Sequence, residues 1–331
     1  MKHSYQHIIS LDNLYEAWKE FVSDKKNKID IGEFLVYLSQ NIYQLHLDLN
    51  NKTYIHGSYE QFSINDPKPR IIHKAKVRDR LLHHAIYRVI YPYFDTRFIF
   101  DSYSCRNMKG THRAINRFRD LARKSSYNHS RTLWVLKCDI RKFFASIDHD
   151  ILYSIIARHN VDTDTLWLIK KVVESFNSTQ KGKGLPLGNL TSQLLVNIYM
   201  NEFDRYMKHT LKIKYYIRYA DDFIILSDRK GELESLRILI GKFLNEWLAL
   251  TLHPDKVYIK TLASGVDFLG WVHFPNHRVL RTATKRRMFR RLAESLKNET
   301  VSSYLGMLGH GNTKKLQKQV RIIIQANNGS K

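Results

Sequence analysis

The chain has 331 residues, of which 43% are hydrophobic and 26% charged, so it is long enough to bury a substantial core and too apolar to be disordered. Its formal net charge of +23 favours polyanionic partners, with nucleic acid first among them. No apolar run is long enough to cross a membrane, and the first residues do not lead into the apolar segment of a signal peptide. The two cysteines, Cys105 and Cys138, lack the CxxC spacing of zinc sites, which fits a reducing, cytoplasmic location.

The first part of the chain is predicted to be mainly helical. Apolar residues recur at helical spacing from about residue 12 to residue 50. Prolines in the following segment break this pattern. Further helices are expected over residues 80–93, ending near Pro92, and over residues 110–123.

The rest of the chain is predicted to alternate short strands with helices. A hydrophobic strand is expected over residues 132–138, immediately before Asp139. Further helices are expected over residues 148–159, 190–206 and 232–250, short strands over 257–260 and 266–273, and basic helices from about residue 284. Long helices packed on a sheet of few strands predict an α+β fold.

Two adjacent acids carry the clearest chemical signal. Tyr219-Ala-Asp-Asp222 separates two runs rich in β-branched and aromatic residues, which predicts a hairpin with the acids at its turn. Burying two adjacent carboxylates is costly without a cation, and Mg²⁺ or Mn²⁺ suits carboxylate oxygens. Asp139 is a third candidate ligand from another strand. Because neighbouring residues in a strand point to opposite faces, we expect Asp221 to be a tighter ligand than Asp222. The alternative interpretation is a simple Asp-rich turn, with Asp139 capping another.

These acids belong to an ordered series of motifs that resembles the boxes of reverse transcriptases. Tyr219-Ala-Asp-Asp222 resembles the polymerase box of that family. The other matching segments are Pro69-Arg70 with Asp79-Arg80 in the fingers, residues 101–115 in the second box, 137–148 around the first metal-binding aspartate, 184–193 in the templating pocket, and 252–256 with 268–270 in the last palm boxes. The resemblance implies RNA-templated DNA synthesis by two-metal nucleotidyl transfer.

The resemblance also implies a right-hand polymerase with a defined domain order. An N-terminal helical extension is expected over residues 1–60. Fingers and palm, the latter a small antiparallel sheet with helices, are expected over residues 61–275, with the palm core at about 130–275. A short basic helical thumb is expected over residues 276–331.

The resemblance further assigns individual site residues. Asp139, Asp221 and Asp222 match the catalytic acids, which would hold two Mg²⁺ ions, with Mn²⁺ as a substitute. The residues matched to dNTP and template binding are Lys68, Arg70, Phe144, Leu187, Gly188, Gln193 and Lys256, and those matched to the primer grip are Phe268, Leu269 and Gly270.

The resemblance implies specific roles for five of these positions. The ring of Phe144 would clash with a 2′-hydroxyl and so select dNTPs. Arg70, helped by Lys68, would grip the triphosphate through paired hydrogen bonds. Lys256 would act as a general acid near the pyrophosphate, and Gly270 would let the backbone approach the primer. The corresponding alternatives are a core phenylalanine, a solvated basic loop, an ordinary turn and a plain strand bend.

The templating-pocket segment points to one branch of the group II intron-like bacterial reverse transcriptases. Most relatives carry Gln before Gly188 and end the segment in Ser-Pro, whereas this chain has Leu187 and ends in Ser192-Gln193. That departure resembles the reverse transcriptases of diversity-generating retroelements. It implies error-prone, adenine-mutagenic cDNA synthesis from a template-repeat RNA for diversification of a target gene (mutagenic retrohoming). An aliphatic residue cannot offer the hydrogen bonds of Gln near the nucleotide.

The implied partners are the template RNA, the primer or cDNA strand, dNTPs and a small basic accessory protein, with no membrane. Two other functions stay open. One is a standalone bacterial reverse transcriptase of a defence or retron-like system. The other is a non-catalytic RNA-binding protein on a palm scaffold.

Overall fold

The computed structural model describes residues 4–65 and 69–328, which form two compact units. The first unit comprises Met1–Arg106, Ile140–Lys212 and Ile240–Pro254, and the second Asn107–Asp139, Ile213–Leu239 and Asp255–Lys331. Each unit is therefore built from segments that are far apart in the sequence.

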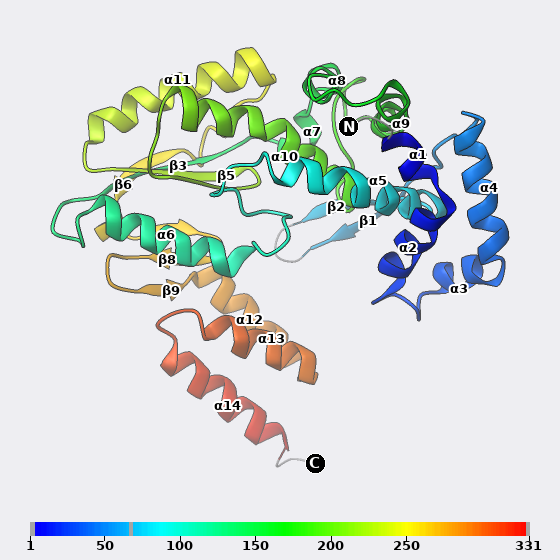
Figure 1. Cartoon of the computed structure of the whole chain (residues 1–331). Coiled ribbons are helices and arrows are strands. Elements are labelled where there is room, and N and C mark those ends of the chain that lie inside the picture. The colour runs from blue at the N-terminus through cyan, green and yellow to red at the C-terminus, as the bar shows by residue number, and fades with distance from the viewer. Residues whose placement is uncertain (1–3, 66–68, 329–331) are drawn as a thin grey trace. The chain divides into compact units, whose positions relative to one another are not determined.

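Helices dominate the first unit. Its N-terminal helices are α1 (Ser4–Ile9), α2 (Leu11–Val22), α3 (Ile29–Val36) and α4 (Leu38–Asn50). Helices α1, α2 and α3 pack on the long helix α5 (Val77–Asp95), and α4 packs on the other three from the outside, as Figure 1 shows. The side-chain oxygen of Ser10 caps α2 by accepting a hydrogen bond from the backbone of Asn13 at 3.2 Å. The helical stretch predicted over residues 12–50 is thus three separate helices, because the polar segment between α2 and α3 has no apolar stripe to bury.

Two features of residues 60–95 differ from the sequence-based expectation. Strands β1 (Glu60–Ile64) and β2 (Arg70–Lys74) form an antiparallel hairpin that was not predicted. Helix α5 does not end near Pro92 but continues to Asp95, with the proline inside it. Buried Phe94 packs in the last turn, and the Tyr91 hydroxyl donates to Asp95 at 2.9 Å, so tertiary contacts outweigh the lost backbone hydrogen bond.

The remaining helices of the first unit are α7 (Phe143–Ser146), α8 (His149–Ala157), α9 (Thr163–Glu174) and α10 (Leu190–Arg205), which a π-helical turn over Tyr206–Thr210 extends. Of these, α8 and α10 match the helices expected over residues 148–159 and 190–206, whereas α7 and α9 were not predicted. Asp148 caps α8 by accepting from the backbone N–H groups of Asp150 and Ile151, both at 3.1 Å. Helix α10 packs on α5 and α8 and is buried along most of its length.

The second unit contains the principal sheet. Strands β3 (Trp134–Asp139), β4 (Tyr216–Tyr219), β5 (Asp222–Ser227) and β6 (Tyr258–Thr261) pair in the order β4-β5-β3-β6, and every pairing is antiparallel. Helix α6 (Thr111–Ser125) packs against β4 and β5. Helix α11 (Lys230–Leu248) follows β5 along the chain.

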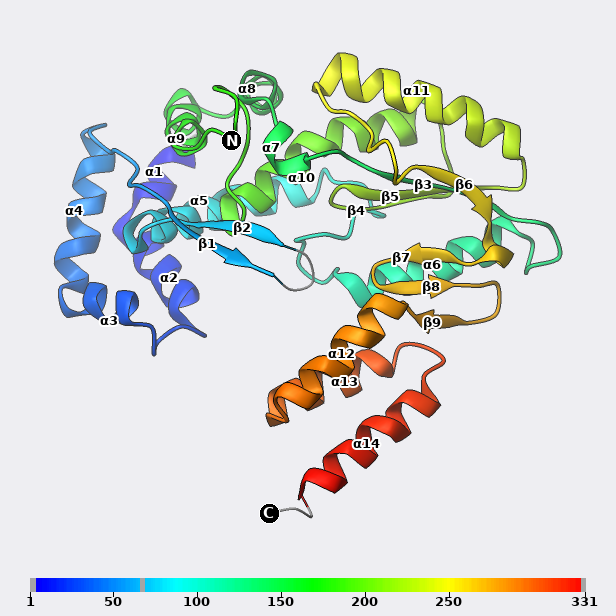
Figure 2. The same ribbon diagram turned by 180° about the vertical axis from the view of Figure 1, so that it is seen from behind.

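A smaller antiparallel sheet leads into the C-terminal helices, as Figure 2 shows. Its strands are β7 (Val266–Phe268), β8 (Trp271–His273) and β9 (Arg278–Leu280), followed by α12 (Thr282–Glu294), α13 (Asn298–Leu308) and α14 (Lys314–Asn328). The single strand predicted over residues 266–273 is instead a hairpin. Leu269 and Gly270 turn the chain with φ of +51° and +85°. The predicted mixed class of helices and small antiparallel sheets is confirmed.

Two adjacent histidines of α5 make a pH-dependent contribution to stability. Burial lowers the pKa of His84 to about 4, with Lys25 and Arg80 adding to the effect, and burial also lowers the pKa of fully buried His83 well below its ordinary value. Between the lowered pKa of His84, about 4, and the ordinary value of about 6.5, the unfolded chain binds more protons than the folded one. The stabilisation is therefore complete above pH 6.5 and is lost as the pH falls.

We expect a His84→Gln variant to lose less stability than the parent between pH 7 and pH 5, by about 1 kcal/mol after allowance for partial exposure. Urea unfolding at the two pH values measures the difference. A His7→Gln variant, changed on an exposed surface, is the matched control. Equal losses in the parent and in His84→Gln would contradict the assignment.

Candidate active site

The principal sheet aligns two of the three predicted acids. In the antiparallel pairing of β3 with β5, Asp139 lies directly opposite Asp222. Residues directly opposite each other in such a pair project from the same face. The side chains of Asp139 and Asp222 are only 18% and 20% exposed. Asp221 precedes Asp222 in the two-residue loop between β4 and β5, so the acids come from one strand end and the adjoining hairpin.

Backbone strain and a buried arginine shape the hairpin that carries the acids. Ala220, in the loop, has a φ of +54°, a left-handed conformation that is unfavourable for a residue with a side chain. Arg218 on β4 is fully buried, and its Nη1 donates a hydrogen bond to the Ala220 carbonyl at 3.1 Å. The guanidinium thus holds the loop in its strained conformation from within the core.

Two lysines contact the strand acids. Lys137 Nζ lies 3.2 Å from Asp222 Oδ2, and Lys256 Nζ lies 3.0 Å from Asp139 Oδ1. Lys137 precedes Asp139 by two residues on β3, so the two side chains share a face. Burial raises the pKa of Asp222 to about 7, against the opposing effect of Lys137. The ammonium groups offset part of the cost of placing carboxylates side by side.

The chemistry of this cluster suits a hard divalent cation. Carboxylate oxygens are the usual ligands of Mg²⁺ and Mn²⁺, and the buried Asp222 Oδ1 has no hydrogen-bond partner within the described residues. In residues 4–65 and 69–328, however, no three His, Cys, Asp or Glu side chains converge as a ready-made metal cage. Asp222 Oδ2 is paired with Lys137, and Asp139 Oδ1 is paired with Lys256. The expected order of ligand strength, Asp221 above Asp222, stays a prediction.

In the first unit, residues 184–193, the predicted templating-pocket segment, are hydrogen-bonded to strand β2 of the β1–β2 hairpin. The His73 backbone N–H donates to the Leu187 carbonyl at 3.0 Å, and Asn189 Nδ2 donates to the His73 carbonyl at 2.9 Å. Gly188 has a φ of +103°, and a Cβ there would lie 2.7 Å from Ile72 Cγ2. The positive φ favours glycine, and a larger residue there would have to displace the Ile72 side chain.

Gly188 and Gln193 line a cavity of about 350 Å³ in the first unit. Basic and aromatic side chains share its walls, among them Phe21, Lys25, Phe62, Lys74 and Arg80. This mixture suits an unpaired nucleic-acid strand, because cations attract phosphates and rings stack on bases. The contribution of α2 was missed from the sequence, because Phe21 there fits the apolar pattern of an ordinary helix.

Three further site candidates belong to the first unit by sequence. Arg70 opens strand β2 and is exposed. Phe144 lies on the short helix α7 and is half-buried, and its carbonyl accepts a hydrogen bond from the Leu185 backbone at 2.8 Å. Lys68 lies outside the described residues.

The candidate primer grip forms the β7–β8 hairpin. Phe268 is fully buried, with its ring centroid 5.6 Å from that of Phe118, so its side chain belongs to the core. Leu269 and Gly270 form the turn, and the Gly270 carbonyl accepts from the Arg281 backbone at 3.1 Å. The turn backbone, rather than the phenylalanine ring, is the part available to a ligand.

Residues 64–273, more than half of the chain, match the family described as reverse transcriptase (RNA-dependent DNA polymerase). The chain belongs to this family. Its matched region is thus a nucleotidyltransferase domain, and the family generally uses divalent metal ions. The resemblance identified from the ordered motifs is confirmed at the level of the family.

Several curated proteins are similar to the chain. Protein YkfC of Escherichia coli is 25% identical over 63% of this chain and 62% of its own length. The group II intron-encoded protein LtrA of Lactococcus lactis is 21% identical over 86% of this chain and 58% of its own. The retron Ec83 reverse transcriptase of Escherichia coli is 31% identical, over 32% of this chain and 36% of its own. The chain spans less than two thirds of the length of these relatives.

Solved telomerase structures share the fold. Apo telomerase of Candida tropicalis has a TM-score of 0.53 at 11% identity, over 82% of this chain and 57% of that one. Telomerase of Candida albicans, in complex with a TWJ fragment of telomeric RNA, has a TM-score of 0.52 at 10% identity, over 81% and 55%. At these identities the similarity shows the polymerase fold alone. None of the described helices has the length and apolar character needed to span a bilayer.

Proposed function

We propose that this chain is an RNA-templated DNA polymerase whose catalytic residues are Asp139, Asp221 and Asp222. The observation that carries the proposal is the register of β3 and β5, which sets Asp139 opposite Asp222 beside the Asp221 loop. Two Mg²⁺ ions, or Mn²⁺ in their place, would lower the pKa of the primer 3′-hydroxyl and neutralise the leaving phosphates. Primer extension on an RNA template with dNTPs tests the proposal.

The chain's own cations have distinct parts in this proposal. Lys137, largely buried, favours the ionised form of Asp222, which burial alone would disfavour. Lys256 contacts Asp139 from a side chain that is 44% exposed, so its ammonium can reach a leaving pyrophosphate and protonate it. Arg70 would bind the triphosphate from the fingers hairpin, with Lys68 beside it in sequence.

The proposed polymerase has a helical extension over residues 1–60, fingers and palm over 61–275 and a basic thumb over 276–331. Template RNA, the primer strand and dNTPs are its proposed ligands, in keeping with the net charge of +23. The N-terminal helices and the basic C-terminal helices are the proposed docking surfaces for RNA or for a small basic accessory protein. The proposed location is the cytoplasm.

We further propose that the polymerase belongs to a diversity-generating retroelement and copies template adenines with low fidelity. The support is Leu187, which takes the place of a hydrogen-bonding Gln in a segment that backbone contacts hold against β2. An apolar side chain cannot bind the nucleotide through polar contacts. The difference in binding free energy between a correct pair and a mispair is therefore smaller. Similarity to the retron Ec83 reverse transcriptase favours a retron-like system as the second candidate. Template and variable repeats in the flanking DNA would favour the first candidate, and a structured non-coding RNA gene the second.

We expect a Leu187→Gln variant to reduce substitutions at template adenines by about tenfold, the value of one hydrogen bond of about 1.4 kcal/mol. Sequencing of cDNA made on a defined RNA template measures the error at each base. Leu187→Met, which keeps an apolar side chain of similar volume, is the matched control and should retain the parent's errors. An unchanged adenine error in Leu187→Gln would remove Leu187 as the cause.

A further inference from the structure

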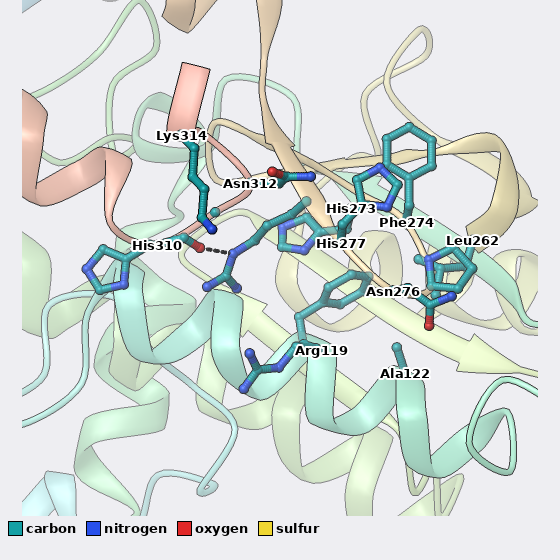
Figure 3. A pocket seen from close by; sticks show the side chains of 14 residues that line it. Arg119, Ala122, Leu262, His273, Phe274, Asn276, His277, His310, Asn312 and Lys314 are labelled. Carbon is teal, nitrogen blue, oxygen red and sulfur yellow. Dashed lines mark hydrogen bonds between the residues drawn. The ribbon is translucent and has the colours of Figure 1, made fainter. Parts of the chain in front are cut away.

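A second cavity, also of about 350 Å³, lies within the second unit and contains none of the residues assigned above to catalysis. Four segments line it, as Figure 3 shows: helix α6, the turn at Leu262 after β6, the turn between β8 and β9, and the loop between α13 and α14. None of its fourteen described lining residues is acidic. Its volume falls in the range of small-ligand sites, about 300–1,000 Å³.

The walls of this cavity are held in place by specific contacts. The Asn312 backbone N–H donates to the Arg278 carbonyl at 2.9 Å, which joins the α13–α14 loop to β9. A Cβ on Gly311 would lie 2.0 Å from the Trp271 ring, so the loop rests directly on β8. Arg278 Nε donates to the His310 carbonyl, and its Nη2 donates to Asn116 Oδ1 at 2.8 Å. The cavity is therefore preformed rather than a gap between mobile segments.

Two buried polar atoms of the lining have no hydrogen-bond partner within the described residues: Arg278 Nη1 and His273 Nε2. His273 is only 3% exposed, and burial lowers its pKa to about 3, so the ring is neutral at physiological pH. Buried polar atoms are nearly always paired, and an unpaired one calls for an explanation. Neighbouring side chains cover both atoms, so a ligand with an anionic acceptor for the guanidinium and a polar edge for the imidazole would satisfy them once those side chains move aside.

Aromatic rings and further cations complete the lining. The rings of Phe274 and His277 stack with centroids 4.8 Å apart and planes inclined by 12°. Figure 3 places Lys314 and Arg119 on two sides of the cavity and this ring pair on a third. Flat apolar surfaces beside cations match a ligand that combines a base with a phosphate.

We propose that this cavity binds one nucleotide of a single-stranded nucleic acid, with its phosphate at Arg278, Arg119 and Lys314 and its base against the rings. The proposed site is additional to the polymerase centre and does not depend on it. A free mononucleotide has the same chemistry but makes only one set of backbone contacts, so a strand is the stronger ligand.

Photo-crosslinking of the full chain tests the site directly. The probes are a tetranucleotide with one 5-iodouridine among uridines, and 5-iodouridine 5′-monophosphate. We expect the tetranucleotide to form adducts within the tryptic peptide of residues 261–278, placed by fragment masses at Phe274 or His277. The double variant Arg119→Glu/Lys314→Glu, at two exposed positions, should lower these adducts at least tenfold.

The matched control is Arg123→Glu/Lys315→Glu, which makes the same charge change at exposed positions outside the lining. The control should keep the adducts, because only the general attraction of the chain for polyanions is reduced. Equal loss in both variants, or no adducts at Phe274, His277 or the α13–α14 loop, would overturn the site. Labelling by the monophosphate but not by the tetranucleotide would overturn the strand as its ligand.

Primer extension separates this proposal from the proposed function. Both double variants change one charge on α14, so any part of that helix in RNA docking is reduced equally in the two. The Arg119→Glu/Lys314→Glu variant should therefore extend a short primer on a short RNA template within about twofold of the control variant. A parent chain that forms the adducts but makes no DNA would refute the polymerase and leave the site intact. A parent chain that makes DNA but forms no adducts would refute the cavity site and leave the polymerase intact.

Discussion

An Asp222→Asn variant is expected to make DNA on an RNA template at least ~10³-fold more slowly than the parent, with the loss in kcat. The substitution keeps the side chain's shape and its place opposite Asp139 but removes the charge needed to hold a cation. Loss of about 4 kcal/mol of transition-state charge stabilisation corresponds to that factor. Single-turnover primer extension in Mg²⁺ measures it, and Asp221→Asn should show a loss of similar size.

Folding and RNA binding separate this loss from a general defect. Because burial raises the pKa of Asp222 to about 7, the charged side chain is costly in the folded state above that pH. The neutral variant should therefore melt at or above the parent's temperature at pH 8, and its RNA affinity should change by less than about twofold. Asp228→Asn, which removes only an exposed ion pair with Arg131 at 3.3 Å, is the matched control. If Asp222→Asn kept more than a tenth of the parent's rate, the catalytic assignment would be wrong.

The local features of the site could be predicted from the sequence. The acids of Tyr219-Ala-Asp-Asp222 interrupt two β-forming runs, and such an interruption in a hairpin falls at the turn. Asp139 follows a short apolar run, and that run is strand β3. These inferences need only side-chain periodicity and turn chemistry, which act over a few residues.

The pairing partners of the acids could not be predicted in this way. That Asp139 faces Asp222 depends on the strand order β4-β5-β3-β6, which connects segments more than eighty residues apart. Contacts of Lys137 and Lys256 with the acids follow from the same order. The period-2 relation between Lys137 and Asp139 was the one local signal that could have identified a lysine on the catalytic face.

Tertiary packing also explains the errors in the predicted elements. Pro92 favours a helix end locally, but α5 continues through it to Asp95 because Phe94, two residues further along, is buried in the core. The run from Val266 to His273 is apolar enough for one strand, yet Leu269 and Gly270 adopt positive φ and reverse it. The second cavity gave no sequence signal, because its lining comes from four segments without a shared motif.

At Phe144 the effect of the side chain can be tested without disturbing the backbone. Its carbonyl accepts from the Leu185 backbone at 2.8 Å, so the main chain is held independently of the ring. The neighbouring Phe143 is only 4% exposed and fills the core, whereas Phe144 is half-buried. A smaller residue at position 144 should therefore leave α7 in place.

We expect Phe144→Val to raise the kcat/KM for ribonucleotides relative to deoxyribonucleotides by ~100-fold, because the space the ring occupied can admit a 2′-hydroxyl. That factor corresponds to a steric penalty of about 2.7 kcal/mol. Competitive primer extension with matched dNTP and rNTP pairs measures the ratio. Phe144→Tyr, which keeps the ring, is the matched control and should discriminate as the parent does. If Phe144→Val discriminated as well as Phe144→Tyr, the ring would be a packing residue, and the preference for dNTPs would have to arise elsewhere in the chain.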